Sequence, residues 1–444
     1  MNFLSLSDIF VPLVYAILIL LFAYFIQQNR VRFNPAYRYF VAGLAAKVVG
    51  AILFALVYTF YYDGGDTTNY FLGSKAIINL FYNYPADALS ILFGNLSPEN
   101  FSLFDGTTGY PPHYMWKDAH TFSVCRYSVP FVFLSFNSFI GATVLLSAVS
   151  FIGIWKLFLL LIKLYPQLQK QFAISLLFVP SVVFWGSGLL KDTYSFGAVC
   201  LFVATFYGFF FEKKKLFING LGLFFAIFFL ATIKPYILYS LLPGVMIWLS
   251  FKQIKAIQST FVKVIIGPAF IAIAMGLAFF TLTRMDDSFG KYSMDNAVNQ
   301  AQVMQEDLKR EVYGTNSFDI GTLDGTLINM VSKAPVAINA ALFRPYIFEA
   351  RSAMLFISGL ENLVLLAFSL WVLFKVGLFR SISLIKNDPF LIFALSFTLI
   401  FAFMVGVSTA NFGALVRYKI PFVPFYLSVL IVILNKVRNQ HGYI

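Results

Sequence analysis

Two acidic residues beside a pair of glycines are the first feature of this chain with chemical potential. Asp63 and Asp66 lie in the stretch DGGDTTNY, residues 63–70. A carboxylate held at such a turn can serve as a general base or bind a divalent cation. Asp-Gly and Asp-Thr are also common in turns and at helix N-termini. A purely structural role is therefore the alternative, a divalent cation stays open, and no cofactor is required.

A second set of charged residues lies where apolar stretches end. Charges near a membrane are costly and persist where they pair or face a ligand, and Arg binds phosphate in a bidentate manner. Together these cations predict a pocket for phosphate or pyrophosphate, whereas each one taken singly also fits snorkelling to water. They are Arg126, Lys191, Lys234, Arg344, Arg351, Arg417 and Lys419. Asp192 follows Lys191, and Glu361 lies within an apolar stretch.

Composition identifies the elements that must position these side chains. Of 444 residues, 59% are hydrophobic and 12% charged, with a mean hydropathy of +0.79. A water-soluble fold could not bury that much apolar surface. Most cations behind the net charge of +12 lie in short loops, so we expect membrane lipids as partners and no nucleic acid. The sequence predicts an all-α, polytopic transmembrane helical bundle forming a single domain, 1–444.

About eleven apolar stretches approach the length of a membrane span, about 20 residues. We place them at 8–28, 39–62, 136–162, 172–190, 193–211, 216–234, 236–251, 261–283, 354–375, 389–408 and 420–435.

The cations of alternate loops predict the orientation, because cytoplasmic loops are enriched in Lys and Arg. On this basis the C-terminus is cytoplasmic and the N-terminus faces outward. The loops concerned carry Arg30, Arg32, Arg38; Lys163, Lys170; Lys213, Lys214, Lys215; Lys252, Lys255; Lys375, Arg380, Lys386; and Lys436, Arg438.

Two outward segments, 63–128 and 284–350, are too long and polar to be simple connections. The first contains apolar stretches, 76–82 and 88–93, that suit helices lying along the membrane interface. In the second, residues 293–313 have the apolar spacing of a helix. Both segments follow spans that end on the outward side, so we expect the candidate site there.

The turn PSVVFWGSGLLKD, residues 180–192, joins two closely spaced spans. Its glycines, Gly186 and Gly188, would admit a neighbouring group or break a helix. It lacks the pattern of a nucleotide-binding loop. The two cysteines, Cys125 and Cys200, are too few for a disulfide framework and fit small buried residues.

These features together resemble the GT-C superfamily of polytopic membrane glycosyltransferases. The resemblance rests on Asp66 in GDTTNY after a span, the interfacial stretches, the PSxxFWGSGxxKD turn and a late RYxxPFxP segment at 417–424. It covers most of the membrane domain by topology. The chain departs from the family pattern by an extra span before the Asp66 segment.

The resemblance implies a bacterial inner-membrane enzyme that acts on the non-cytoplasmic face in surface-polysaccharide or envelope-glycoconjugate assembly. Its donor would be a polyprenyl-phosphate-linked sugar, and its acceptor a lipid-linked molecule or a polysaccharide. Asp66 maps onto the catalytic base, with Asp63 as the second choice, and the outward cations would hold the donor phosphate.

Two alternatives remain open. A Wzy-like polymerase of lipid-linked oligosaccharide repeats relies on outward arginines and often lacks an acidic base. A lipid-linked-substrate transporter or flippase would show inverted repeats and ionisable residues near the middle of the membrane, of which Glu361 is the one clear acidic case.

Overall fold

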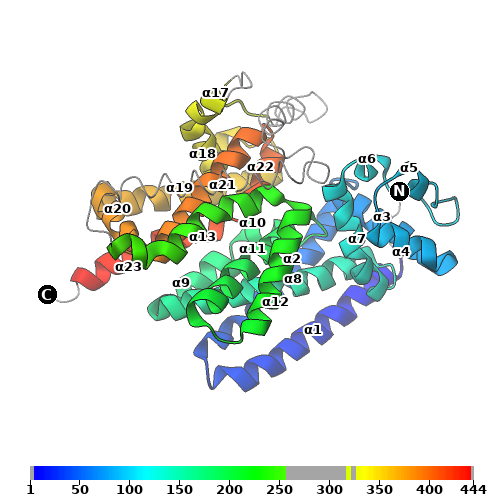
Figure 1. Cartoon of the computed structure of the whole chain (residues 1–444), viewed down its shortest axis with the longest axis horizontal. Coiled ribbons are helices and arrows are strands. Elements are labelled where there is room, and N and C mark those ends of the chain that lie inside the picture. Colours follow the sequence, from blue (N-terminus) through cyan, green and yellow to red (C-terminus); the bar gives the residue numbers. More distant parts are fainter. Residues whose placement is uncertain (1–4, 257–316, 322–326, 442–444) are drawn as a thin grey trace. The chain divides into compact units, whose positions relative to one another are not determined.

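The structure is a computed structural model of the whole chain, and it describes residues 5–256, 317–321 and 327–441 (Figure 1). These residues form helices and turns, with one isolated bridge between Ser317 and Asn411. The all-helical prediction is confirmed for this part of the chain. The chain divides into two compact units, 1–234 and 235–444.

Eight helices of the described residues are long and apolar enough to cross a membrane, or nine if a helix pair bent by 61° counts as one span. The sequence predicted about eleven. One of these, 261–283, lies outside the described residues, and another, 172–190, is not a continuous helix. The segment 293–313 also lies outside the described residues.

The first unit contains most of the described spans and the first long segment. Its helices are α1 (Ser7–Val31), α2 (Phe40–Phe60), α3 (Asp66–Asn83), α4 (Pro85–Phe93), α5 (Pro98–Phe101), α6 (His113–Trp116), α7 (Ala119–Leu134), α8 (Phe139–Leu164), α9 (Gln169–Phe172), α10 (Pro180–Trp185), α11 (Lys191–Tyr207) and α12 (Leu216–Ile233).

Helix α8 is the centre of this unit, and it packs against α1, α2 and α11. Gly153 and Gly197 let α8 and α11 approach closely, because a Cβ on Gly153 would lie 2.2 Å from the carbonyl oxygen of Gly197. Lys163, near the end of α8, forms an ion pair at 2.8 Å with Glu212, which ends the π-helical turn Gly208–Glu212 that continues α11. The two helices therefore run parallel, and the intervening chain must return to the end where α8 begins.

The returning segment, 172–190, is broken where the sequence predicted a span. A π-helical turn at Ala173–Leu177 ends before Val179, whose extended backbone precedes α10. Pro180 explains the break, since proline disfavours a helical conformation in the residue before it and donates no backbone hydrogen bond. The segment nevertheless follows the length of α2. Successive glycines mark the contacts: Gly43 meets Leu177, Gly50 meets Val183 and Gly188 meets Phe54.

The predicted long segment 63–128 folds into helices α3 to α7, which gather at one side of the first unit (Figure 1). The stretches 76–82 and 88–93 are helical, as expected, within α3 and α4. Helices α3 and α7 pack closely and in parallel. Ser74 donates a hydrogen bond to the carbonyl of Cys125 at 2.8 Å, and Tyr82 lies beside Phe133, two turns further along both helices.

The second unit contains α13 (Pro235–Ala256), α17 (Leu327–Ser332), α18 (Ala334–Phe343), α19 (Ala353–Val376), α20 (Leu378–Lys386), α21 (Pro389–Ser408), α22 (Phe412–Tyr418) and α23 (Val423–His441). Helix α21 is central to it and packs against α13, α18 and α23. Trp248 stacks on Phe393 at 5.0 Å between ring centroids, and Lys436 pairs with Asp388 at 2.6 Å. Of the second long segment, 284–350, only residues 317–321 and 327–350 are described.

Candidate functional site

The turn that carries Asp63 and Asp66 is built by three successive residues with positive φ. These are Asp63, Gly64 and Gly65, at 50°, 109° and 135°. Helix α3 then begins at Asp66, where a negative side chain is stabilised by the free N–H groups of the first turn. Both carboxylates are exposed. Asp63 thus lies in a turn and Asp66 at a helix start, and its exposure leaves Asp66 accessible for chemistry.

Tyr114 and Asn69 lie next to Asp66. The Tyr114 hydroxyl is 3.5 Å from Asp66 Oδ1 and accepts a hydrogen bond from Asn69 Nδ2 at 2.9 Å. Partial burial, together with the charge of Asp66, raises the pKa of Tyr114 to about 12. The phenol therefore stays protonated at neutral pH and directs its O–H toward the carboxylate, at a distance longer than an ordinary hydrogen bond.

Lys191 lies at the start of α11 and contacts the start of α7. Its ammonium donates to Thr121 Oγ1 at 2.7 Å and lies 4.0 Å from Asp118 Oδ2. Asp118 is the N-cap of α7, and it accepts hydrogen bonds from the His120 N–H and the Thr121 hydroxyl. The Lys191 side chain is 18% exposed, so its ammonium group is accessible at the surface where the starts of α7 and α11 meet.

The next residue, Asp192, has a different environment. It is fully buried and forms an ion pair with Lys234 at 2.6 Å, so that the start of α11 is tied to the end of α12. His120 adds a second link, since its Nδ1 lies 2.9 Å from the carbonyl oxygen of Thr232. The starts of α7 and α11 and the end of α12 therefore converge.

The Asp66 turn and the 180–192 turn are joined through Tyr58 of α2. A Cβ on Gly65 would lie 3.2 Å from the Tyr58 ring, and that ring contacts Trp185 edge-on at 6.4 Å. The predicted close approach at the second turn is confirmed, because a Cβ on Gly188 would lie 2.3 Å from the ring of Phe54. Lys47 of α2 also donates a hydrogen bond to the Gly186 carbonyl. These contacts fix both turns to α2.

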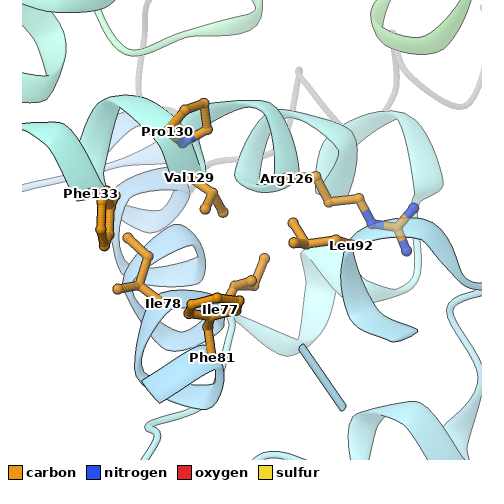
Figure 2. A pocket seen from close by; sticks show the side chains of 8 residues that line it. All are labelled: Ile77, Ile78, Phe81, Leu92, Arg126, Val129, Pro130 and Phe133. Carbon is orange, nitrogen blue, oxygen red and sulfur yellow. The ribbon is translucent and has the colours of Figure 1, made fainter. Parts of the chain in front are cut away.

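Arg126 lies five residues beyond Thr121 on α7, beside a cavity of about 340 Å³ between α3, α4 and α7. Figure 2 shows apolar side chains around this cavity and the Arg126 guanidinium at one edge. The guanidinium donates to the Gly94 carbonyl at 2.6 Å. The structure thus places one predicted phosphate ligand next to an apolar pocket.

The cations of the second unit are held by local partners. Arg344 forms an ion pair with Glu349 and lies over the rings of Phe318 and Phe412, at 4.9 and 5.3 Å. Lys419 is buried and donates to Asn362 Oδ1.

The other candidate site residues of that unit, Glu361, Arg351 and Arg417, differ in how exposed they are. Glu361, which directly precedes Asn362 on α19, is partly buried. Arg417 is also partly buried, and Arg351 is exposed. The structure brings Lys419 to the helix that carries Glu361, while Arg351 remains open to solvent.

The described residues contain no group of three or more His, Cys, Asp or Glu side chains that could hold a metal ion. Asp63 and Asp66 are therefore not part of such a group within the described residues. Cys125 and Cys200 are buried and form no disulfide, as the sequence predicted.

Sequence reasoning missed Asp118, Thr121 and Tyr114. A signal for the first two was present, because Asp118 followed by Thr121 and an apolar run is typical of a helix N-cap. Tyr114 had no such signal, since its contact with Asp66 joins elements 48 residues apart.

The comparisons with known proteins give no relative: no family model, no curated protein and no solved structure matches this chain. The function must therefore be argued from the site.

Proposed function

We propose that this chain is an integral-membrane glycosyltransferase of the bacterial inner membrane. It would move a sugar from a polyprenyl-phosphate donor to an acceptor hydroxyl on the non-cytoplasmic face. The product would enter surface-polysaccharide or envelope-glycoconjugate assembly.

The observation that carries the proposal is an exposed acid and a partly exposed cation at the same end of the α3–α7 pair. Asp66 begins α3, and Lys191 contacts Thr121 in the first turn of α7. The two helices run parallel, because Ser74 meets Cys125 and Tyr82 meets Phe133. Thr121, one turn before Cys125, is therefore level with the first turns of α3.

The chemistry needs one proton acceptor and one positive charge. Asp66 would take the proton of the acceptor hydroxyl while its oxygen attacks the anomeric carbon. The bond from that carbon to the phosphate oxygen breaks, and the electron pair leaves with the lipid phosphate. Lys191 would stabilise the developing negative charge. A single displacement of this kind inverts the anomeric configuration.

Two other predicted phosphate ligands fit this role less well. Lys234 is buried against Asp192, and Arg344 is paired with Glu349. A cation already neutralised by a carboxylate attracts a phosphate weakly, and separating such a buried pair is costly. Lys191 also faces a carboxylate, that of Asp118, but at 4.0 Å, which is longer than the contact in either of these pairs. The proposal therefore assigns the donor phosphate to Lys191.

Transfer of radiolabelled sugar from polyprenyl-phosphate donors by the reconstituted protein tests the proposal. We expect Asp66→Asn to lower the rate by about 10²- to 10⁴-fold, the usual contribution of a general base. Lys191→Ala should also lower it. Asp63→Asn is the matched control, because it removes a neighbouring exposed carboxylate and asparagine tolerates the positive φ of this position. Equal losses in both Asp variants would contradict the assignment of the base.

The polymerase alternative depends on the second unit, where Arg351 is exposed and Arg417 is partly buried. If wild-type protein transfers nothing from monophosphate donors, it should next be supplied with pyrophosphate-linked oligosaccharides. Polymerisation that is lost in Arg417→Ala and unaffected in Asp66→Asn would replace the transferase proposal.

A further inference from the structure

The cavity beside Arg126 has a strongly apolar lining with one cation at its edge. Its volume of about 340 Å³ is within the range of small-molecule sites, roughly 300 to 1,000 Å³. The apolar side chains that line it include Ile77, Ile78 and Phe81 of α3, Leu92 of α4, and Val129 and Phe133 of α7 (Figure 2). Such a lining fits a hydrocarbon chain.

Arg126 is short of hydrogen-bond and charge partners among the described residues. One terminal nitrogen donates to the Gly94 carbonyl at 2.6 Å, and the guanidinium lies 5.3 Å from the centre of the Phe122 ring. Its Nε is buried and has no hydrogen-bond partner in the described part of the chain, where no carboxylate pairs with the guanidinium either. Burial lowers the pKa of Arg126. A partly buried cation in this state gains most from an anion that accepts two hydrogen bonds.

The surroundings of the cavity are apolar and exposed. Phe81 and Phe133 are about half exposed while also lining it, and Phe93, at the end of α4, is 84% exposed. An apolar rim of this kind is unfavourable in water and favourable against acyl chains. The natural occupant is therefore a molecule that already lies in the membrane.

The cavity is separate from the proposed reaction site. Ser74, which meets Cys125 next to Arg126, lies eight residues after Asp66 on α3, or about 12 Å at 1.5 Å per residue. In the proposed reaction the base and the leaving phosphate are separated only by the acceptor oxygen and the anomeric carbon, which must approach each other to about 3 to 3.5 Å. A lipid phosphate at this level of α3 is thus not the one that leaves from the sugar next to Asp66.

We propose that this cavity is a binding site for an anionic phospholipid of the surrounding bilayer, with the phosphate on Arg126 and one acyl chain between α3 and α7. The lipid completes the charge balance of Arg126 and fills the apolar space, so that it stabilises the packing of α3, α4 and α7. This assignment does not depend on sugar transfer.

Lipid binding to the purified full chain, followed by native mass spectrometry, tests the assignment. The probes are phosphatidylglycerol and phosphatidylcholine with identical acyl chains, which differ in net charge. We expect wild type to bind phosphatidylglycerol about tenfold more tightly. Arg126→Gln should abolish the preference, and Arg126→Lys should retain part of it. Ile78→Trp, which fills the cavity and keeps the cation, should weaken binding of both lipids.

Lys75→Gln is the matched control, since Lys75 is an exposed cation on α3 outside the cavity lining, and it should bind as wild type does. Equal affinity for the two lipids, or an Arg126→Gln variant that keeps the preference, would overturn the assignment. Displacement of phosphatidylglycerol by a lower concentration of polyprenyl phosphate would overturn it too, by making a prenyl lipid the occupant. Asp66→Asn should bind phosphatidylglycerol normally, so this result is independent of the transferase test.

Discussion

Arg126 in the first unit and Arg344 in the second appear equivalent in sequence and differ in their environment. Arg126 lies midway along α7 and Arg344 follows the end of α18, and each has its guanidinium over an aromatic ring. Arg344 is paired with Glu349, five residues later, whereas no carboxylate pairs with Arg126 in the described part of the chain. The paired arginine is part of the protein's own packing. The arginine beside the cavity retains the capacity to bind an anion.

The largest expected effect on stability is at Lys234, a buried cation that is paired with Asp192. Lys234→Met should lower the free energy of unfolding by about 3 to 5 kcal/mol, because it leaves Asp192 charged and fully buried. Unfolding in detergent, followed by circular dichroism, measures this loss. The double variant Lys234→Met with Asp192→Leu should recover part of it. If Lys234→Met is as stable as wild type, the pair does not hold α11 to α12.

Removing the partner of Arg344 should have the next largest effect. Glu349→Gln leaves a half-buried guanidinium without its carboxylate, which should cost about 2 kcal/mol. The same unfolding measurement applies. Glu99→Gln is a suitable control, since Glu99 is exposed on the short helix α5 and forms no ion pair with a described residue. Similar stability of the two variants would remove the distinction between paired and unpaired arginines.

The contact between α3 and α7 beside the cavity can be tested at Gly73. A Cβ at this position would lie 2.6 Å from Cys125 Sγ, so Gly73→Ala should force the helices apart and cost about 1 to 2 kcal/mol. Gly106→Ala is the control, because a Cβ there meets nothing within 4 Å. We expect Gly73→Ala also to weaken lipid binding. Unchanged stability would show that the α3–α7 contact is looser than the structure indicates.

The smallest effect on stability is expected at Arg126 itself. In detergent without added lipid, Arg126→Gln should change the free energy of unfolding by less than about 1 kcal/mol, because losing the bond to Gly94 is offset by removing a desolvated cation. With phosphatidylglycerol, wild type should gain thermal stability and the variant should not. A large loss in lipid-free detergent would mean that Arg126 is structural, as Arg344 is.

Local patterns were enough to predict most of the helices. Helix α21 has the expected bounds, 389–408, and α12 and α19 differ from their predictions by one residue at one or both ends. Long apolar runs bounded by charges report directly on spans. The segment 172–190 does not form the continuous helix that was predicted, because hydropathy averages over Pro180 and does not register the break in the backbone there.

The sequence by itself determined that this is an all-helical chain with many apolar spans, and it singled out Asp66 and the cations at span ends, because composition and periodicity depend on neighbours along the chain. Only the tertiary structure decided which of those cations are neutralised. Lys191 and Asp192 are adjacent in the sequence. Lys191 is partly exposed and contacts Thr121, whereas Asp192 is buried against Lys234. Such outcomes depend on residues dozens of positions away, since burial and pairing are set by which helices pack together.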